Sequence, residues 1–170
     1  MEKKSGMITK FVLKIVLFAY ELVRWLIILS ALLLIILYLC GIRPYIVQSG
    51  SMEPAITTGS VCFVNHHAKY ENVKKGDIIT FQFGTDSVAT HRAVAVEKDG
   101  IRTKGDANET EDSALVTEDV FIGETIGSIP ELGYFITALQ TRNGIITTAA
   151  FMLFLILLGK LLEPSKENES

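Results

Sequence analysis

The chain has 170 residues, enough for one ordinary domain with some sequence to spare. Its 16 basic and 19 acidic residues leave a formal net charge of −3, and no basic patch is interleaved with aromatic residues, so we expect no nucleic-acid partner. Hydrophobic residues make up 49% of the chain and gather at its two ends, which predicts membrane segments around a more polar middle. Two cysteines form no disulfide framework, so we expect free, buried thiols at Cys40 and Cys62.

The N-terminal region predicts a retained membrane anchor. Residues 25–41 are apolar and uncharged, and residues 42–44, Ile-Arg-Pro, do not resemble a signal-peptide cleavage site. Such a run crosses most of a hydrocarbon core about 30 Å thick. Residues 1–24 predict an amphipathic segment at the cytoplasmic interface, with a single tilted helix as the alternative. The charges that would share one helical stripe there are Lys10, Lys14, Glu21 and Arg24.

A second apolar run, residues 144–160, predicts a C-terminal transmembrane helix followed by the polar tail 161–170. The excess of Lys and Arg before residue 25 favours a cytoplasmic N-terminus. Residues 42–140 would then lie outside the membrane, and the tail would return to the cytoplasm. A C-terminal helix that only packs on the domain is the alternative.

The middle of the chain, residues 42–140, has the pattern of short strands separated by turns. Asp99-Gly100 is a hairpin signal, and no segment between the apolar ends has a convincing helical period. We therefore expect a mainly β fold: a small coiled β-sheet or barrel-like domain flanked by N- and C-terminal transmembrane helices. The expected strands are residues 44–47, 61–64, 77–83, 92–97, 101–103, 120–123 and 125–127.

One serine and one histidine stand in settings that suit nucleophilic chemistry. Ser51 follows a β-prone run and comes directly after Gly50, whose missing side chain lets another backbone approach, while Pro54 ends regular pairing. His91 opens an apolar strand, and an imidazole at a strand end can take a proton from a serine if the fold brings the two together. An ordinary Ser-Gly-Ser turn and a structural histidine are the alternatives.

An acidic loop at residues 103–112 offers a carboxylate for the histidine. Such a group would accept the second imidazole proton, fix the tautomer and stabilise the imidazolium that forms. Asp106 and Asp112 are the candidates, whereas we expect Glu109 and Glu111 to be solvated.

The two other histidines, His66 and His67, lie in a polar loop without acidic or cysteine partners at metal-ligand spacing. We expect them to be solvated loop residues rather than metal ligands. The sequence therefore predicts no metal site and no cofactor, and any chemistry must come from the side chains themselves.

Four short blocks together resemble type I signal peptidases. They are Ser51-Met52-Glu53-Pro54, Lys75-Gly76-Asp77-Ile78-Ile79, His91-Arg92, and Lys104-Gly105-Asp106 with Asp112. They occur in the family's order and cover roughly residues 42–128. Bacterial housekeeping members carry a lysine where this chain has His91, so the resemblance is to the endoplasmic-reticulum-type branch. That branch also occurs in archaea and in spore-forming Gram-positive bacteria.

The resemblance implies a membrane-bound serine endopeptidase that removes signal peptides from exported preproteins by a Ser-His-Asp mechanism. It would act in the cell membrane, or in the endoplasmic-reticulum membrane of a eukaryote, with the lipid bilayer and preproteins as partners. The sequence carries no signal for accessory subunits. By matching position, Ser51 is the nucleophile, His91 the general base, and the Ser49 hydroxyl with the Ser51 N–H the oxyanion-stabilising pair. Asp112 is preferred for orienting His91, and Asp106, at the Gly105 turn, stays the other candidate.

Two further functions explain fewer of these features. A self-cleaving Ser/Lys protease of the SOS-repressor type would require a lysine in place of His91 and no membrane spans. A non-catalytic membrane-anchored assembly factor would use the β domain only to bind exported chains. Replacing Ser51 separates that reading from an enzyme, because a binding module should tolerate Ser51→Ala.

Overall fold

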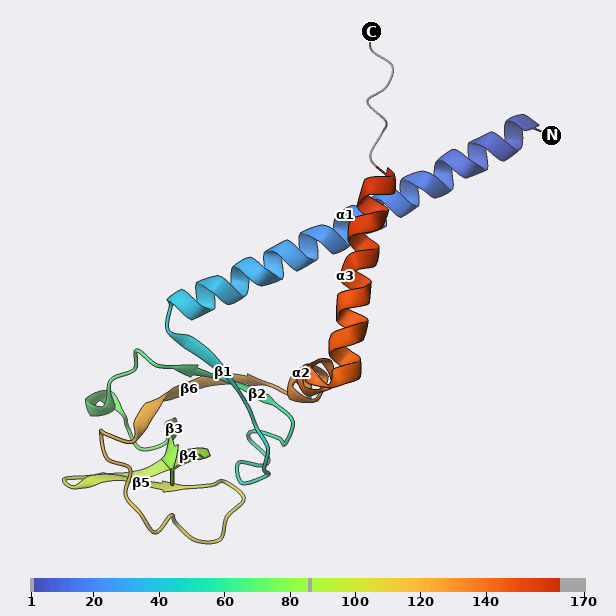
Figure 1. Cartoon of the computed structure of the whole chain (residues 1–170). Helices are drawn as coiled ribbons and strands as arrows, with labels where there is room; N and C mark the ends of the chain where they lie inside the picture. The colour runs from blue at the N-terminus through green and yellow to red at the C-terminus, as the bar shows by residue number, and fades with distance from the viewer. Residues whose placement is uncertain (1, 86, 163–170) are drawn as a thin grey trace. The chain divides into compact units, whose positions relative to one another are not determined.

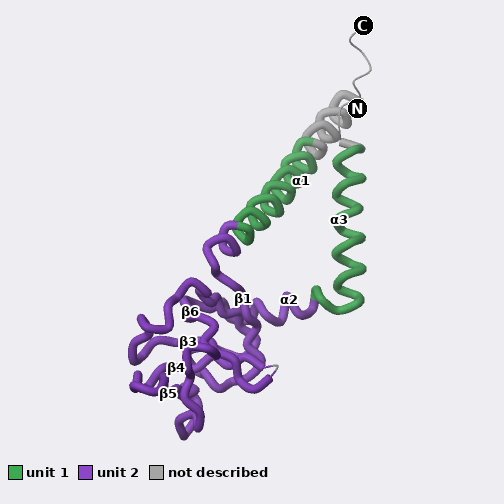
Figure 2. Tube along the Cα trace, turned by 60° about the vertical axis from the view of Figure 1, so that its left-hand side comes forward, with its two compact units in different colours: residues 1–35, 139–170 green, residues 36–138 purple. Residues whose placement is uncertain are grey.

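A computed structural model describes residues 2–85 and 87–162 of the chain. They fall into two compact units: a domain of residues 36–138, and a second unit that combines the chain up to residue 35 with the chain from residue 139 (Figure 2).

The second unit consists of long apolar helices. Helix α1 runs without a break from Glu2 to Leu39, and α3 runs from Arg142 to Leu162 (Figure 1). Two stretches are long and apolar enough to cross a membrane, Lys14–Leu39 and Arg142–Lys160, and neither is buried by protein. Their large apolar side chains are exposed, as contact with lipid requires. A separate interfacial segment before residue 25 is not marked by a break in α1 and stays a prediction.

The domain is built on an antiparallel sheet of six strands in the order β1-β2-β6-β3-β4-β5. The sheet is open, because the described residues of β1 and β5 do not pair with each other. The predicted sheet is therefore confirmed, whereas strand pairing among the described residues does not close it into a barrel. The strands are β1 (Ile42–Ile46), β2 (Val61–Asn65), β3 (Ile78–Phe83), β4 (Ser87–Glu97), β5 (Gly100–Lys104) and β6 (Phe121–Ile129).

The helix content departs from expectation. The described helices hold more residues than the strands, so "mainly β" suits the domain and not the whole chain. Besides the short 3-10 turn η1 (Tyr70–Asn72), the domain includes most of α2 (Leu132–Gln140), for which the sequence shows no convincing helical period. With nine residues, α2 is too short to display a clear apolar repeat. The chain turns from β6 into α2 at Glu131, a non-glycine residue with φ of 61°.

Two buried clusters form the core. The larger contains Val73, Ile79, Phe81, Ala93, Ile101 and Val116, and the smaller contains Met52, Ile56 and Cys62. Burial raises the pKa of the Cys62 thiol to about 11, so it stays protonated at neutral pH. Cys40 is also free but exposed. The expectation that it is buried is wrong, because it directly follows α1, whose last apolar side chains are uncovered.

Candidate active site

The loop between β1 and β2 holds Ser51 and is anchored at its base and its middle. At the base, the Val47 N–H donates to the Ser60 carbonyl at 2.9 Å. In the middle, the side chains of Met52 and Ile56 are 2% and 4% exposed and pack in the smaller core cluster. Burying a side chain of this size stabilises a fold by about 1.5–3 kcal/mol. The residue directly after the serine is thus fixed in the core.

The loop after β5 holds the backbone of the same serine. The Ala107 N–H donates to the Ser51 carbonyl at 2.9 Å. A Cβ at Gly105 would lie only 2.6 Å from that carbonyl oxygen, so this close approach requires glycine. Within the serine loop, Glu53 Oε1 accepts from the N–H and the hydroxyl of Thr58, at 3.2 and 3.0 Å. These contacts explain why a glutamate and a distant glycine accompany the serine.

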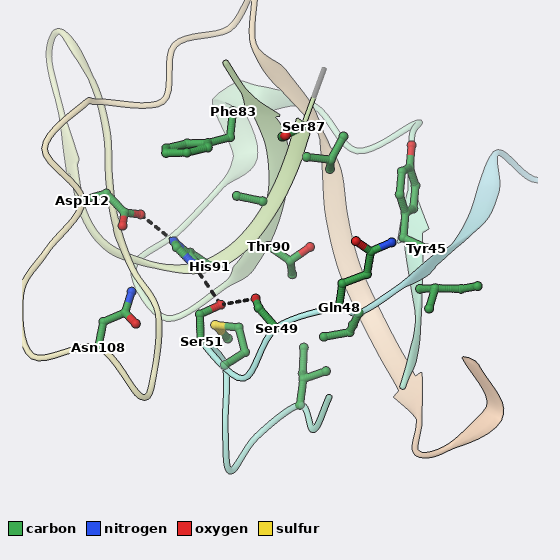
Figure 3. Close-up of a pocket in the computed structure, with 16 residues that line it drawn as sticks. Tyr45, Gln48, Ser49, Ser51, Phe83, Ser87, Thr90, His91, Asn108 and Asp112 are labelled. Atoms are coloured by element: carbon green, nitrogen blue, oxygen red, sulfur yellow. Dashed lines mark hydrogen bonds and ion pairs between the residues drawn. The ribbon is translucent and has the colours of Figure 1, made fainter. Parts of the chain in front are cut away.

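His91, on β4, lies between the serine and a carboxylate (Figure 3). Its Nε2 is 3.2 Å from Ser51 Oγ, and its Nδ1 is 2.6 Å from Asp112 Oδ2. An ionised carboxylate only accepts hydrogen bonds, so the ring hydrogen belongs on Nδ1 and Nε2 is left to accept from the serine hydroxyl. The Phe81 ring packs edge-on against the imidazole, with the ring centroids 6.1 Å apart. The structure thus brings Ser51, His91 and Asp112 into one hydrogen-bonded series.

Asp112 has a second partner that the sequence analysis did not find. The Thr103 hydroxyl donates to Asp112 Oδ2 at 2.6 Å, and the Asp112 N–H donates to the Thr103 carbonyl at 2.8 Å. Thr103 is fully buried on β5, where it shares the inward-facing alternation of the strand with Ile101. A polar side chain at such an inward position is the sequence signal that could have identified it.

Asp106 binds Arg92 and not His91. Its two carboxylate oxygens accept from Arg92 Nε at 2.8 Å and from Arg92 Nη2 at 2.6 Å. Arg92 Nη1 also donates to the Gly76 carbonyl at 2.8 Å. The hydrogen bond to Asp106 raises the pKa of Arg92 above its already high value. This ion pair ties together three of the four sequence blocks without reaching the serine hydroxyl.

Ser49, whose hydroxyl is one of the two predicted oxyanion donors, lies next to Ser51. Its Oγ is 3.5 Å from Ser51 Oγ. The backbone N–H of Ser51 donates to no acceptor in the part of the chain that the structure describes. A hydroxyl and a backbone N–H are therefore both available beside Ser51 Oγ.

These residues line a cavity of about 750 Å³ between a strand end with its following loop and a second strand. The first segment, Tyr45–Ser49, is the end of β1 and the start of the loop after it, and the second is the first half of β4, Ser87–His91. β1 pairs only with β2, and β5 pairs with β4 only from Arg92 onward. Each segment therefore has one edge without a strand partner among the described residues. Exposed edges of this kind bind extended peptides by adding a strand.

The remaining candidate residues lie away from the serine hydroxyl. His66 and His67 are exposed, and the His66 ring stacks on Tyr45, whose hydroxyl is 3.1 Å from His66 Nε2. Partial desolvation lowers the pKa of His66, with smaller contributions from nearby positive groups. Glu109 is exposed, and Glu111 lies at the surface 3.6 Å from Arg102 Nε.

Comparison with known proteins places this geometry in a family. A family model described as "Signal peptidase, peptidase S26" matches residues 19–126, a range that contains Ser51, His91 and Asp112. Signal peptidase I W of Bacillus subtilis is 42% identical over 77 residues, which is 43% of this chain and 40% of that protein. A signal peptidase complex catalytic subunit of Sclerotinia sclerotiorum is 32% identical over 123 residues, 65% of this chain and 72% of the relative.

The human catalytic subunit of the signal peptidase complex, SEC11C, is 35% identical over 102 residues, 52% of each chain. The chain thus spans between 40% and 72% of the length of these relatives. The family match covers more than half of the chain and includes the serine loop, β4 and the acidic loop. The chain therefore belongs to the signal peptidase family, peptidase S26.

Proposed function

We propose that this protein is a membrane-bound serine endopeptidase that cleaves N-terminal signal peptides from exported preproteins. The observation that carries the proposal is the hydrogen-bonded series from Ser51 through His91 to Asp112, in a cavity lined by the segment Tyr45–Ser49 and by the first half of β4. The family and the names of the relatives, which are signal peptidases or their catalytic subunits, support the same reaction.

The reaction follows from the direction of the hydrogen bonds. As Ser51 Oγ attacks the carbonyl carbon of the scissile bond, His91 Nε2 takes the hydroxyl proton, and Asp112 stabilises the imidazolium. The imidazolium then gives this proton to the departing amine, which becomes the new N-terminus of the mature protein. Water, deprotonated by His91, attacks the acyl-enzyme ester and releases the signal peptide with a free carboxylate.

The tetrahedral intermediate requires donors for its oxyanion. In this proposal the Ser51 N–H and the Ser49 hydroxyl supply them, because both lie beside Ser51 Oγ. A preorganised donor of this kind lowers the barrier by about 3 kcal/mol. Asp106 takes no part in the proton transfers, because its carboxylate is occupied by Arg92.

The substrate class is consistent with the shape of the cavity. An extended chain can pair with the free edge next to Ser49 and with the free edge of β4, so main-chain hydrogen bonds would supply most of the binding. Met52 and Ile56 line the cavity and are fixed in the core, which leaves apolar walls. Signal peptides present small residues at the cleavage site.

The membrane arrangement is part of the proposal. Both apolar helices would span the bilayer, with both termini in the cytoplasm and residues 43–140 outside. Several relatives are named as catalytic subunits of a signal peptidase complex, and the proposal extends to accessory subunits for this chain. A cysteine that replaces Lys69 should be labelled from outside intact cells. Protection of this cysteine, together with labelling at the C-terminus, would show that the chain has the opposite orientation in the membrane.

The enzyme is tested by co-expression with a tagged preprotein. We expect the wild-type chain to shorten the preprotein at its signal-peptide junction, and Ser51→Ala to abolish the shortening at the same membrane level of protein. Processing by Ser51→Ala at the wild-type rate would contradict the enzyme and favour an assembly factor that binds exported chains. N-terminal sequencing of the product identifies the bond that is cut.

A further inference from the structure

We propose that Thr103 is a positioning residue of the active site: its hydroxyl holds the Asp112 carboxylate in the orientation in which it accepts the hydrogen bond from His91. This inference rests on the proposed function, because it concerns the same proton relay. It adds a fourth side chain to that relay, one that touches neither the substrate nor the serine.

The geometry makes Thr103 and His91 joint donors to one oxygen atom. Asp112 Oδ2 accepts from His91 Nδ1 at 2.6 Å and from the Thr103 hydroxyl at 2.6 Å. The backbone of Asp112 is held by the same residue, through its N–H to the Thr103 carbonyl at 2.8 Å. Thr103 therefore fixes both the backbone position of Asp112 and the rotation of its carboxylate.

The sheet register explains why Thr103 can do this. Thr103 lies directly opposite Ala93 in the pairing of β4 with β5. Directly opposed residues of an antiparallel pair project to the same face, and so do residues two apart along a strand, such as His91 and Ala93. Thr103 and His91 are thus mounted on one face of two paired strands, while Asp112 arrives from a loop outside any strand.

A loop carboxylate needs such a restraint more than a strand residue does. The His91 and Asp112 side chains are 13% and 18% exposed, so little water is available to replace a lost hydrogen bond. Threonine is also β-branched and has few side-chain rotamers, so its hydroxyl is a rigid donor. The alternative is that the hydroxyl only satisfies its own need for a partner in the buried strand.

The test uses purified full-length enzyme and the tagged preprotein, with rates expressed per folded molecule. Thr103→Val keeps the β-branched shape and removes the hydroxyl, and we expect kcat to fall about 10- to 100-fold, as for loss of a charge-assisted hydrogen bond. KM should change little, because Thr103 does not line the catalytic cavity. Thr103→Ser keeps a hydroxyl and should recover most of the rate. Thr110→Val, at an exposed position of the loop that holds Asp112, is the matched control and should cleave normally.

A double-variant cycle separates positioning from stability. If Thr103 acts through the Asp112 carboxylate, Thr103→Val should cause almost no further loss in an Asp112→Ala background, measured in single turnover with excess enzyme. Full additivity of the two losses would overturn the inference. So would unchanged kcat in Thr103→Val, or equal losses in Thr103→Val and Thr103→Ser. If Thr103→Val folds poorly, Thr103→Ala is the second hydroxyl-free variant for the same comparison.

The two proposals fail in different ways. Wild-type enzyme that does not cut, or Ser51→Ala that still cuts, would contradict the proposed function. Cleavage that depends on Ser51 but proceeds at the full rate in Thr103→Val would contradict only the role of Thr103.

Discussion

The two faces of β4 carry adjacent residues, each paired with an aspartate of the same loop. On one face His91 contacts Asp112 and, through its other nitrogen, Ser51. On the other face Arg92 binds Asp106 through two parallel hydrogen bonds and ends on a backbone carbonyl. The two pairs have similar hydrogen-bond distances, yet only the first continues to the Ser51 hydroxyl.

The difference lies in the basic side chain of each pair. A histidine gains and loses its proton near neutral pH, so a carboxylate beside it can assist proton transfer. A guanidinium is always charged, and the hydrogen bond to Asp106 raises the pKa of Arg92 further. The Arg92 pair therefore cannot take part in a proton relay and serves to hold the acidic loop against β4. The comparison predicts that damage to one face abolishes turnover and damage to the other weakens the fold.

The largest effect is expected on the histidine face. His91→Ala should lower turnover about 10⁴- to 10⁶-fold, as loss of a general base does in serine proteases. His91→Lys should do no better, because a lysine beside Asp112 stays protonated and cannot accept the serine proton. Preprotein processing at neutral pH measures both variants. Substantial cleavage by His91→Lys would mean that Asp112 does not support the base at position 91.

A smaller effect is expected on the arginine face. Asp106→Asn leaves Arg92 without its carboxylate partner and should lower the free energy of unfolding by about 1–3 kcal/mol. Turnover per folded molecule should fall much less than in His91→Ala. Thermal unfolding of the purified enzyme, followed together with its processing rate, measures the two effects separately. Wild-type stability in this variant would show that the ion pair does not hold the loop.

The smallest effect is expected outside both faces. Glu111 is the immediate neighbour of Asp112 in the sequence, but its side chain is 52% exposed. Its Oε2 lies 3.6 Å from Arg102 Nε. A solvated pair of this kind contributes about 0–1 kcal/mol. Glu111→Gln should therefore leave processing unchanged and shift stability by less than about 0.5 kcal/mol. A large loss of processing would place a further acid of the loop in the mechanism.

Much of the domain could be predicted from the sequence, because the signals for strands and turns are local. Strand alternation and the Asp-Gly turn correctly predict β3 and the hairpin of β4 with β5. The predicted start of β4 is too late: the strand begins at Ser87, so His91 lies within it and does not open it. The nine residues of α2 are too few for a helical repeat to be recognised. The exposure of Cys40 could not be predicted, because it depends on whether other parts of the fold pack against it. The roles of Ser51 and His91 rest on the family resemblance and stay predictions until the variants are measured.

The pairing of the two aspartates could not be read from spacing. Asp106 and Asp112 are six residues apart in one loop, and either could reach a histidine on a neighbouring strand. The path of the loop decides between them, and that path depends on non-local hydrogen bonds from Ala107 to Ser51 and from Asp112 to Thr103. The contact of Thr103 with Asp112 is non-local in the same way, because the register of β5 against β4 brings Thr103 onto the face of His91.

The most direct test of the account compares Asp112→Asn with Asp106→Asn in one experiment, as the single-turnover rate of preprotein cleavage per folded enzyme molecule. Asp112→Asn keeps the shape of the side chain but favours the wrong histidine tautomer, and we expect a loss of about 10⁴-fold. Asp106→Asn should retain most of the rate once unfolded protein is discounted. A dead Asp106→Asn beside an active Asp112→Asn would contradict the account and make Asp106 the acid that supports His91.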